Sequence, residues 1–123
     1  MLTITRIFRF EACHSLPHYD GKCHQLHGHS YKLSVTVSGD IVTDPHNPKY
    51  GMIIDFSDLK KIVNEKVIDK YDHAHLNAFF ENPTAEIMVE KIAEDISRAL
   101  PNNVKLVSVK LWETENSYAE YIV

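Results

Sequence analysis

Two segments near the start of the chain alternate between apolar and polar residues, which is typical of half-buried β-strands. The first spans residues 2–14, and one of its faces carries Ile4, Phe8, Phe10, Ala12 and His14. The second spans residues 27–38, and its apolar face carries Tyr31, Leu33, Val35 and Val37. Residues 15–25 include Pro17, Asp20 and Gly21, so the pattern predicts a loop between the two strands.

Helical spacing of apolar residues appears in the middle of the chain. Asp55 is suited to cap the start of a first helix. Its apolar positions are Phe56, Leu59, Ile62, Val63 and Val67. Thr84 is suited to cap a second helix, with Glu86 in the first turn. The apolar face expected for this helix carries Ile87, Ile92, Ala93, Ile96 and Leu100.

Two further strands are predicted at the end of the chain, over residues 104–114 and 118–123. One face of the first of these strands is expected to carry Val107, Val109, Leu111 and Glu113. The resulting order, β-β-α-α-β-β, predicts an α+β fold with a four-stranded antiparallel sheet and two helices on one face. A chain of 123 residues is expected to form a single domain over residues 1–123.

Composition and charge narrow the functional classes. Apolar residues make up 44% and charged residues 24%, the usual range of soluble proteins. The formal net charge of −4 gives no basic surface for nucleic acid. Neither an apolar run long enough to cross a membrane nor the apolar core of a signal peptide is present. We therefore expect a cytoplasmic protein with neither a nucleic acid nor a membrane as partner.

Three histidines indicate a metal site. His27 and His29 lie two residues apart on a predicted strand, so their imidazoles leave it on the same side. His14 ends the preceding strand and is the best third ligand. Imidazole suits Zn²⁺, and a catalytic zinc typically has three protein ligands and one open position. The alternative is that these are core or surface histidines that bind no metal.

The two cysteines have different expected roles. Cys23 could be a fourth zinc ligand that closes a structural site, or a nucleophile or general base beside an open one, because nearby imidazoles and a metal favour the thiolate. The sequence leaves both readings open. Cys13 should point to the face of its strand opposite to His14 and is expected to be structural. A disulfide between the two cysteines is disfavoured in a reducing compartment.

Three polar residues outside the histidine cluster are further candidates. Asp72 and His73 are adjacent, and a carboxylate can orient an imidazole and raise its basicity. Glu113 follows an apolar row on its strand, where an acid needs a partner such as the N–H groups of a guanidine-like ring edge. The alternatives are a solvated loop for the first pair and a solvated strand end for Glu113.

Several stretches of the chain together resemble motifs of the 6-pyruvoyl-tetrahydropterin synthase family. They are residues 10–14 (F-x-A-x-H), 23–29 (C-x-x-x-H-G-H), 51–56 (G-M-V-x-D-F), 72–77 (D-H-x-x-L-N), 83–86 (P-T-x-E) and 113–114 (E-T). They occur in the family's order and cover nearly the whole chain. The spacing from Cys23 to His27 is similar to that of the 6-carboxytetrahydropterin synthase branch, whereas the animal-type pyruvoyl enzymes carry a longer insertion there.

The resemblance implies an architecture and roles for individual residues. It implies the tunnelling fold, in which subunits join their sheets into trimers that stack as homohexamers. It also implies the following assignments, given by role: zinc on His14, His27 and His29; a catalytic base, Cys23; a proton relay, Asp72 and His73, from a neighbouring subunit; and substrate contacts from Glu113, the anchor of the pterin ring, and Thr84.

The reaction implied by the resemblance starts from 7,8-dihydroneopterin triphosphate. The favoured branch releases triphosphate and acetaldehyde and leaves 6-carboxy-5,6,7,8-tetrahydropterin, a precursor of queuosine-type 7-deazaguanine nucleosides. The first alternative is 6-pyruvoyl-tetrahydropterin synthase activity, which eliminates triphosphate without cleaving the side chain. A more distant alternative is a zinc-stabilised binding module without turnover, in which Cys23 would be a ligand.

Overall fold

The computed structural model describes residues 1–123, apart from the side chain of Cys23. Its strands are β1 (Thr3–His14), β2 (His27–Gly39), β3 (Ala74–His75), β4 (Val104–Thr114) and β5 (Ser117–Ile122). Its helices are α1 (Phe56–Val63), the π-helical η2 (Asn64–Ile68), α2 (Asp69–Tyr71) and α3 (Ala85–Ala99). Two short 3₁₀ turns are η1 (Lys22–His24) and η3 (Leu76–Ala78).

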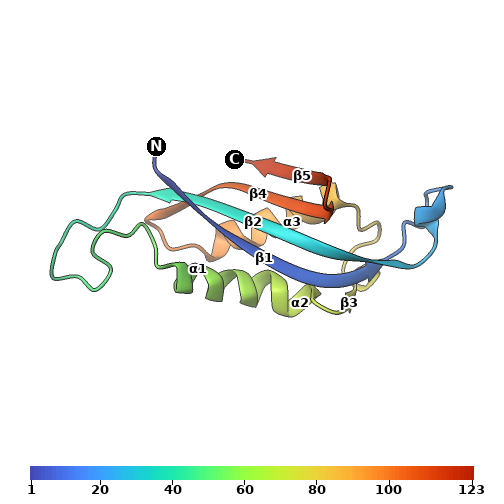
Figure 1. Ribbon diagram of the computed structural model, residues 1–123, viewed down its shortest axis with the longest axis horizontal. Coiled ribbons are helices and arrows are strands. Elements are labelled where there is room, and N and C mark those ends of the chain that lie inside the picture. The colour runs from blue at the N-terminus through green and yellow to red at the C-terminus, as the bar shows by residue number, and fades with distance from the viewer.

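The strands form one sheet in the order β3-β1-β2-β4-β5 (Figure 1). β1, β2, β4 and β5 pair antiparallel, as predicted. The prediction of four strands was wrong by one, because β3 adds a two-residue strand parallel to β1. Two residues are too few to show an alternating pattern. The α+β class is confirmed.

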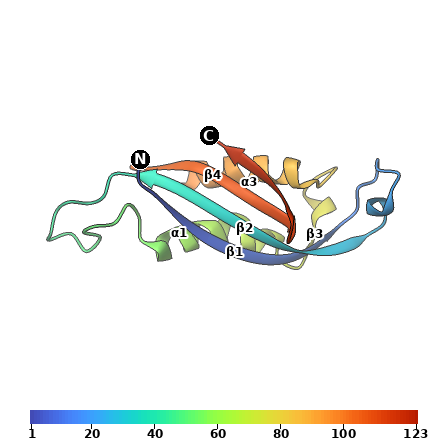
Figure 2. The same cartoon turned by 45° about the horizontal axis from the view of Figure 1, so that its top comes forward.

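The helices cover one face of the sheet, and the core lies between the two layers (Figure 2). Asp55 caps α1 by accepting a hydrogen bond from the Ser57 N–H, as predicted. The predicted apolar faces of the helices need correction at two positions, because Phe56 and Ile87 are exposed. In α3 the buried side chains are those of Met88, Val89, Ile92, Ala93 and Ile96.

The predicted face of β4 was also partly wrong. A bulge interrupts the β2–β4 register, since Thr36 pairs with Ser108 but Val37 pairs with Leu106. The bulge leaves Val107 out of the apolar row and brings Leu106 into it. Strict alternation cannot show where such an extra residue lies. Beyond the bulge the predicted alternation holds as far as Glu113, which places that carboxylate on the helix-covered side.

Two long loops lie at opposite ends of the sheet (Figure 1). Residues 15–26 connect β1 to β2 at the end where β3 lies, and residues 40–55 connect β2 to α1 at the other end. The histidine cluster is at the first end, where β1 finishes and β2 begins. In the described part of the chain, no helix has the length and apolar character needed to span a membrane.

Candidate metal centre and active site

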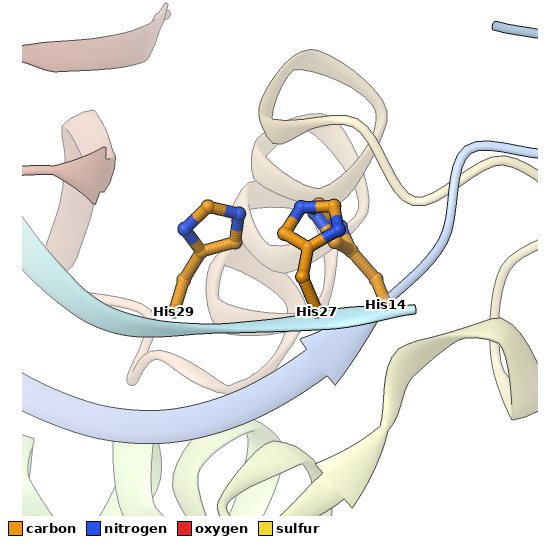
Figure 3. Close-up of side chains that lie close together, drawn as sticks. All are labelled: His14, His27 and His29. Carbon is orange, nitrogen blue, oxygen red and sulfur yellow. Dashed lines mark hydrogen bonds between the residues drawn. The ribbon is translucent and has the colours of Figure 1, made fainter. Parts of the chain in front are cut away.

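The pairing of β1 with β2 brings three histidines together. His14 lies opposite His27, and Ala12 lies opposite His29, so residues two apart on β2 flank the end of β1. All three imidazoles project from the same face of the sheet (Figure 3). One nitrogen from each ring lies within 4.8 Å of the others. The structure therefore gathers the three histidines that the sequence nominated as ligands.

Backbone carbonyls set the tautomers of two of these rings. The Nδ1 atom of His14 lies 2.8 Å from the Pro83 carbonyl oxygen, and Nδ1 of His27 lies 2.7 Å from that of Gln25. A carbonyl can only accept a hydrogen bond, so Nδ1 carries the proton in both rings. The two Nε2 atoms then present lone pairs to each other at 3.0 Å. A shared cation between them would turn this repulsion into attraction.

His29 provides a second sign that the cluster suits a cation. Its Nε2 atom is buried and has no hydrogen-bond partner among the described residues. A buried polar atom without a partner carries a desolvation cost. Three imidazole nitrogens within 4.8 Å of one another are a donor set that zinc accepts. Backbone oxygens orient two of the three rings, as is usual for histidine ligands of zinc. The donor set present therefore fits zinc.

Burial favours the neutral form of His14 and of His29. Desolvation lowers the pKa of His14 and of His29, and the nearby Glu113 carboxylate offsets only part of this effect. The neutral ring is the form that binds a metal. Because the unfolded chain would bind protons at a higher pH, the fold loses stability as the pH falls below about 6.5, the ordinary histidine value.

Glu113 lies beside the histidine cluster. Its carboxylate oxygens are 3.6 Å from Nε2 of His29 and 3.9 Å from Nε2 of His14. It also lines a cavity of about 340 Å³ together with Ala85, Glu86, Ser117, Tyr118 and Ala119. The carboxylate thus connects the three imidazoles to a space that a small ring system could enter.

Thr84, the other substrate-binding residue nominated from the sequence, lies at the start of α3. Its hydroxyl accepts a hydrogen bond of 3.2 Å from the Ile87 N–H and caps the helix. The two residues that follow it, Ala85 and Glu86, line the Glu113 cavity, whereas Thr84 is not among the lining residues. Its direct contact with substrate stays a prediction.

Asp72 and His73 form a pair at the edge of the sheet, next to β1. The Asp72 carboxylate accepts a hydrogen bond of 2.9 Å from the Glu11 N–H and lies 3.1 Å from Nδ1 of His73. The Glu11 hydrogen bond and then the His73 contact lower the pKa of Asp72. The His73 ring is 80% exposed. These contacts tie the pair to Glu11, and His73 and His29 both line a cavity of about 390 Å³.

Cys13 lies on β1, whereas Cys23 lies in the η1 turn. Cys13 is half-buried, and its thiol is 3.7 Å from the Ala74 carbonyl oxygen, at the junction of β1 and β3. The side chain of Cys23 lies outside the described residues, so its two expected roles stay predictions. Its backbone belongs to the η1 turn in the loop between His14 and His27.

Comparison with known proteins identifies the family. Residues 3–122 match the model of the family described as 6-pyruvoyl tetrahydropterin synthase. The chain belongs to this family. It is 37% identical to the 6-carboxy-5,6,7,8-tetrahydropterin synthase of Haemophilus influenzae over 98% of this chain and 99% of the relative. The resemblance inferred from the motifs is confirmed, and the chain is a member of an enzyme family.

Two other proteins that are similar to this chain have names that imply other reactions. The dihydroneopterin monophosphate aldolase of Pyrococcus furiosus is 38% identical over 85% of this chain and 82% of the relative. The 6-pyruvoyl tetrahydropterin synthase structure from Caenorhabditis elegans superposes with a TM-score of 0.84 at 28% identity, covering 99% of this chain and 95% of that one. Membership of the family therefore leaves the reaction to be argued from the site.

Some functional groups of this family member were missed at the sequence level. The carbonyls of Gln25 and Pro83 orient two imidazoles, but any residue supplies a carbonyl, so residue type gives no signal. Glu86 was assigned only to a helix start, although it shares a cavity with Glu113. The clue available was its place in the P-T-x-E motif, three residues beyond the carbonyl that holds His14.

Proposed function

We propose that the protein is a zinc-dependent lyase that converts 7,8-dihydroneopterin triphosphate to 6-carboxy-5,6,7,8-tetrahydropterin, with release of triphosphate and acetaldehyde. This activity would serve the synthesis of queuosine-type 7-deazaguanine nucleosides. The observation that carries the proposal is the grouping of the three imidazoles beside the Glu113 carboxylate and its cavity. The similarity to the Haemophilus influenzae enzyme supports the same reaction.

The three histidines would hold the metal. His14 and His27 keep their Nδ1 protons on backbone carbonyls, which leaves both Nε2 atoms free for coordination. His29 contributes the buried Nε2 atom that lacks a partner within the described chain. Zinc bound there would supply a positive charge that polarises the side-chain hydroxyls of the substrate and acidifies the neighbouring carbon.

Glu113 would hold the pterin ring. A pterin presents adjacent N–H groups that match the two oxygens of a carboxylate. Glu113 has both the position next to the imidazoles and a cavity with room for a ring. Glu86, on the wall of the same cavity, offers a second acceptor. We propose that these two acids orient the ring so that its side chain reaches the metal.

Proton transfer would fall to Cys23, Asp72 and His73. The Cys23 thiolate would remove a proton from the side-chain carbon, since a low-pKa thiolate can act as a base. The Asp72 carboxylate holds the Nδ1 proton of His73, so the exposed Nε2 atom is available for proton exchange. This pair would return a proton to the substrate.

Assembly into a homohexamer would complete the site. Asp72 and His73 lie at the β3 edge of the sheet, whereas the Glu113 cavity lies beside β5 at the other edge. β3 pairs only with Ala12 and Cys13, so most of β1 is left without a neighbour on that side within the described chain. We propose that β1 of one subunit joins β5 of the next, which brings the relay of one chain to the cavity of another.

Light scattering coupled to size-exclusion chromatography tests this assembly. A protein with two long unpaired sheet edges is expected to cover them. The proposed state gives about six times the chain mass of 14.1 kDa at micromolar concentration. A monomer under these conditions would contradict the assembly.

The reaction itself is tested by product identification. The zinc-loaded protein is incubated separately with 7,8-dihydroneopterin triphosphate and with the monophosphate, and the pterins and aldehydes are identified by mass spectrometry. The proposal predicts the 6-carboxy product and acetaldehyde from the triphosphate. A 6-pyruvoyl product would instead establish the first alternative. Preferential cleavage of the monophosphate would point to the aldolase named among the relatives. Absence of any product would favour the zinc-stabilised binding module.

A further inference from the structure

The Asn77 side chain makes two hydrogen bonds with the backbone of Ser15. Its side-chain oxygen accepts a hydrogen bond of 2.9 Å from the Ser15 N–H. Its side-chain N–H donates a second bond, also of 2.9 Å, to the Ser15 carbonyl oxygen. A single half-buried amide thus satisfies both backbone groups of one residue, as a neighbouring strand would do.

This amide closes a series of contacts along β1. The series begins at Glu11, whose N–H bonds the Asp72 carboxylate and whose carbonyl accepts the His73 N–H. It continues through the pairing of β1 with β3, which has just two residues. The Asn77 side chain then extends the series beyond the end of both strands to Ser15. Residues 72–77 are therefore held against β1 at both ends by side chains.

Ser15 occupies a critical place in the chain. It directly follows His14, a ligand in the proposed zinc site, and it begins the loop that carries Cys23 and returns to His27. The loop projects beyond the sheet (Figures 1 and 2). The direction in which the chain leaves His14 is thus set in part by the Asn77 amide.

We propose that Asn77 is a positioning residue that gives the Cys23 loop and the Asp72–His73 pair one common anchor. This inference rests on the proposed function, in which Cys23 and the relay exchange protons with substrate. If the relay acts in the neighbouring subunit, Asn77 also links the thiol of one active site to the relay of the next. Its contribution is geometric, because a side-chain amide acts as neither an acid nor a base near neutral pH.

The test compares Asn77→Ala and Asn77→Asp with a matched control, Asn47→Ala. Asn47 likewise accepts a backbone N–H bond of 2.8 Å, from Lys49, but lies in the loop at the opposite end of the sheet. Asn77→Asp keeps an acceptor for the Ser15 N–H and loses the donor for its carbonyl, so it preserves part of the anchor if the alanine variant fails to fold. Zinc content, kcat, KM and hydrogen exchange of residues 15–26 are measured for each.

We expect kcat of Asn77→Ala to fall roughly 10- to 100-fold, the scale of an ångström-level misplacement of catalytic groups. KM and zinc content should stay close to those of the wild type, and exchange in residues 15–26 should rise. Asn77→Asp should show a smaller change in the same direction, and Asn47→Ala no change. Unchanged kcat, unchanged exchange, or loss of zinc in Asn77→Ala would overturn the proposal.

Failure of the proposed function would be seen separately. If the wild-type protein does not convert the pterin substrate, the hydrogen-exchange comparison still decides whether Asn77 anchors the loop. Faster exchange in residues 15–26 of Asn77→Ala, but not of Asn47→Ala, supports the anchor. Equal exchange in all variants overturns it.

Discussion

Replacing His29 with alanine is expected to remove most of the zinc from the purified protein, which should otherwise hold about one ion per chain. Loss of an orienting partner behind a ligand already costs 10- to 100-fold in metal affinity, so loss of the ligand itself should cost at least about 100-fold. Compared with the metal-free wild type, this variant should lose little stability, because the buried Nε2 atom of His29 has no hydrogen-bond partner in the described structure. Elemental analysis measures the zinc.

His46→Ala is the matched control for this variant, since His46 is exposed in the loop at the other end of the sheet. Thermal unfolding with and without added zinc gives a second readout. A ligand at 100 times its Kd adds about 2.7 kcal/mol to the free energy of unfolding. This gain should be present in the wild type and in His46→Ala and absent in His29→Ala. Full zinc occupancy in His29→Ala would remove His29 from the site.

The sequence predicted the grouping of the three histidines well because this grouping follows from strand periodicity. His27 and His29 share a side of β2 by alternation alone, and the loop after His14 returns directly to His27. Those two facts are enough to bring the three rings together. The carbonyls of Gln25 and Pro83 could not be predicted, because their positions depend on how the loop and the start of α3 pack.

Features that depend on strand register and on helix rotation could not be predicted from the sequence. β3 is two residues long, and β4 has one bulge at Val107 and a second register shift, toward β5, between Trp112 and Thr114. Ile87 is exposed because α3 turns a different side to the sheet, with Met88 and Val89 buried. Apolar residues occur on neighbouring sides of this helix, so the sequence does not show which side is buried. The placement of the Asp72–His73 pair at the sheet edge opposite β5 is likewise a matter of sheet order, which residue types do not reveal.

Replacing Cys23 with alanine is expected to reduce turnover by roughly 100-fold or more, the scale of a positioned general base. The three histidines should still hold zinc, because one nitrogen from each ring already lies within 4.8 Å of the others. The fold and binding of the pterin through Glu113 should also be retained. Cys13→Ala is the matched control, since that thiol contacts a backbone carbonyl at the β1–β3 junction and should be dispensable for turnover.

The zinc content of the purified Cys23→Ala protein is the most direct test of the claim that these histidines form a catalytic rather than a structural centre. A catalytic zinc keeps an open position, whereas a fourth protein ligand closes the site and contributes directly to folding. We expect the Cys23→Ala protein to hold about one zinc per chain and to melt at the wild-type temperature although it has lost its turnover. A variant depleted of zinc and destabilised would show instead that Cys23 is a ligand, and would contradict the catalytic assignment.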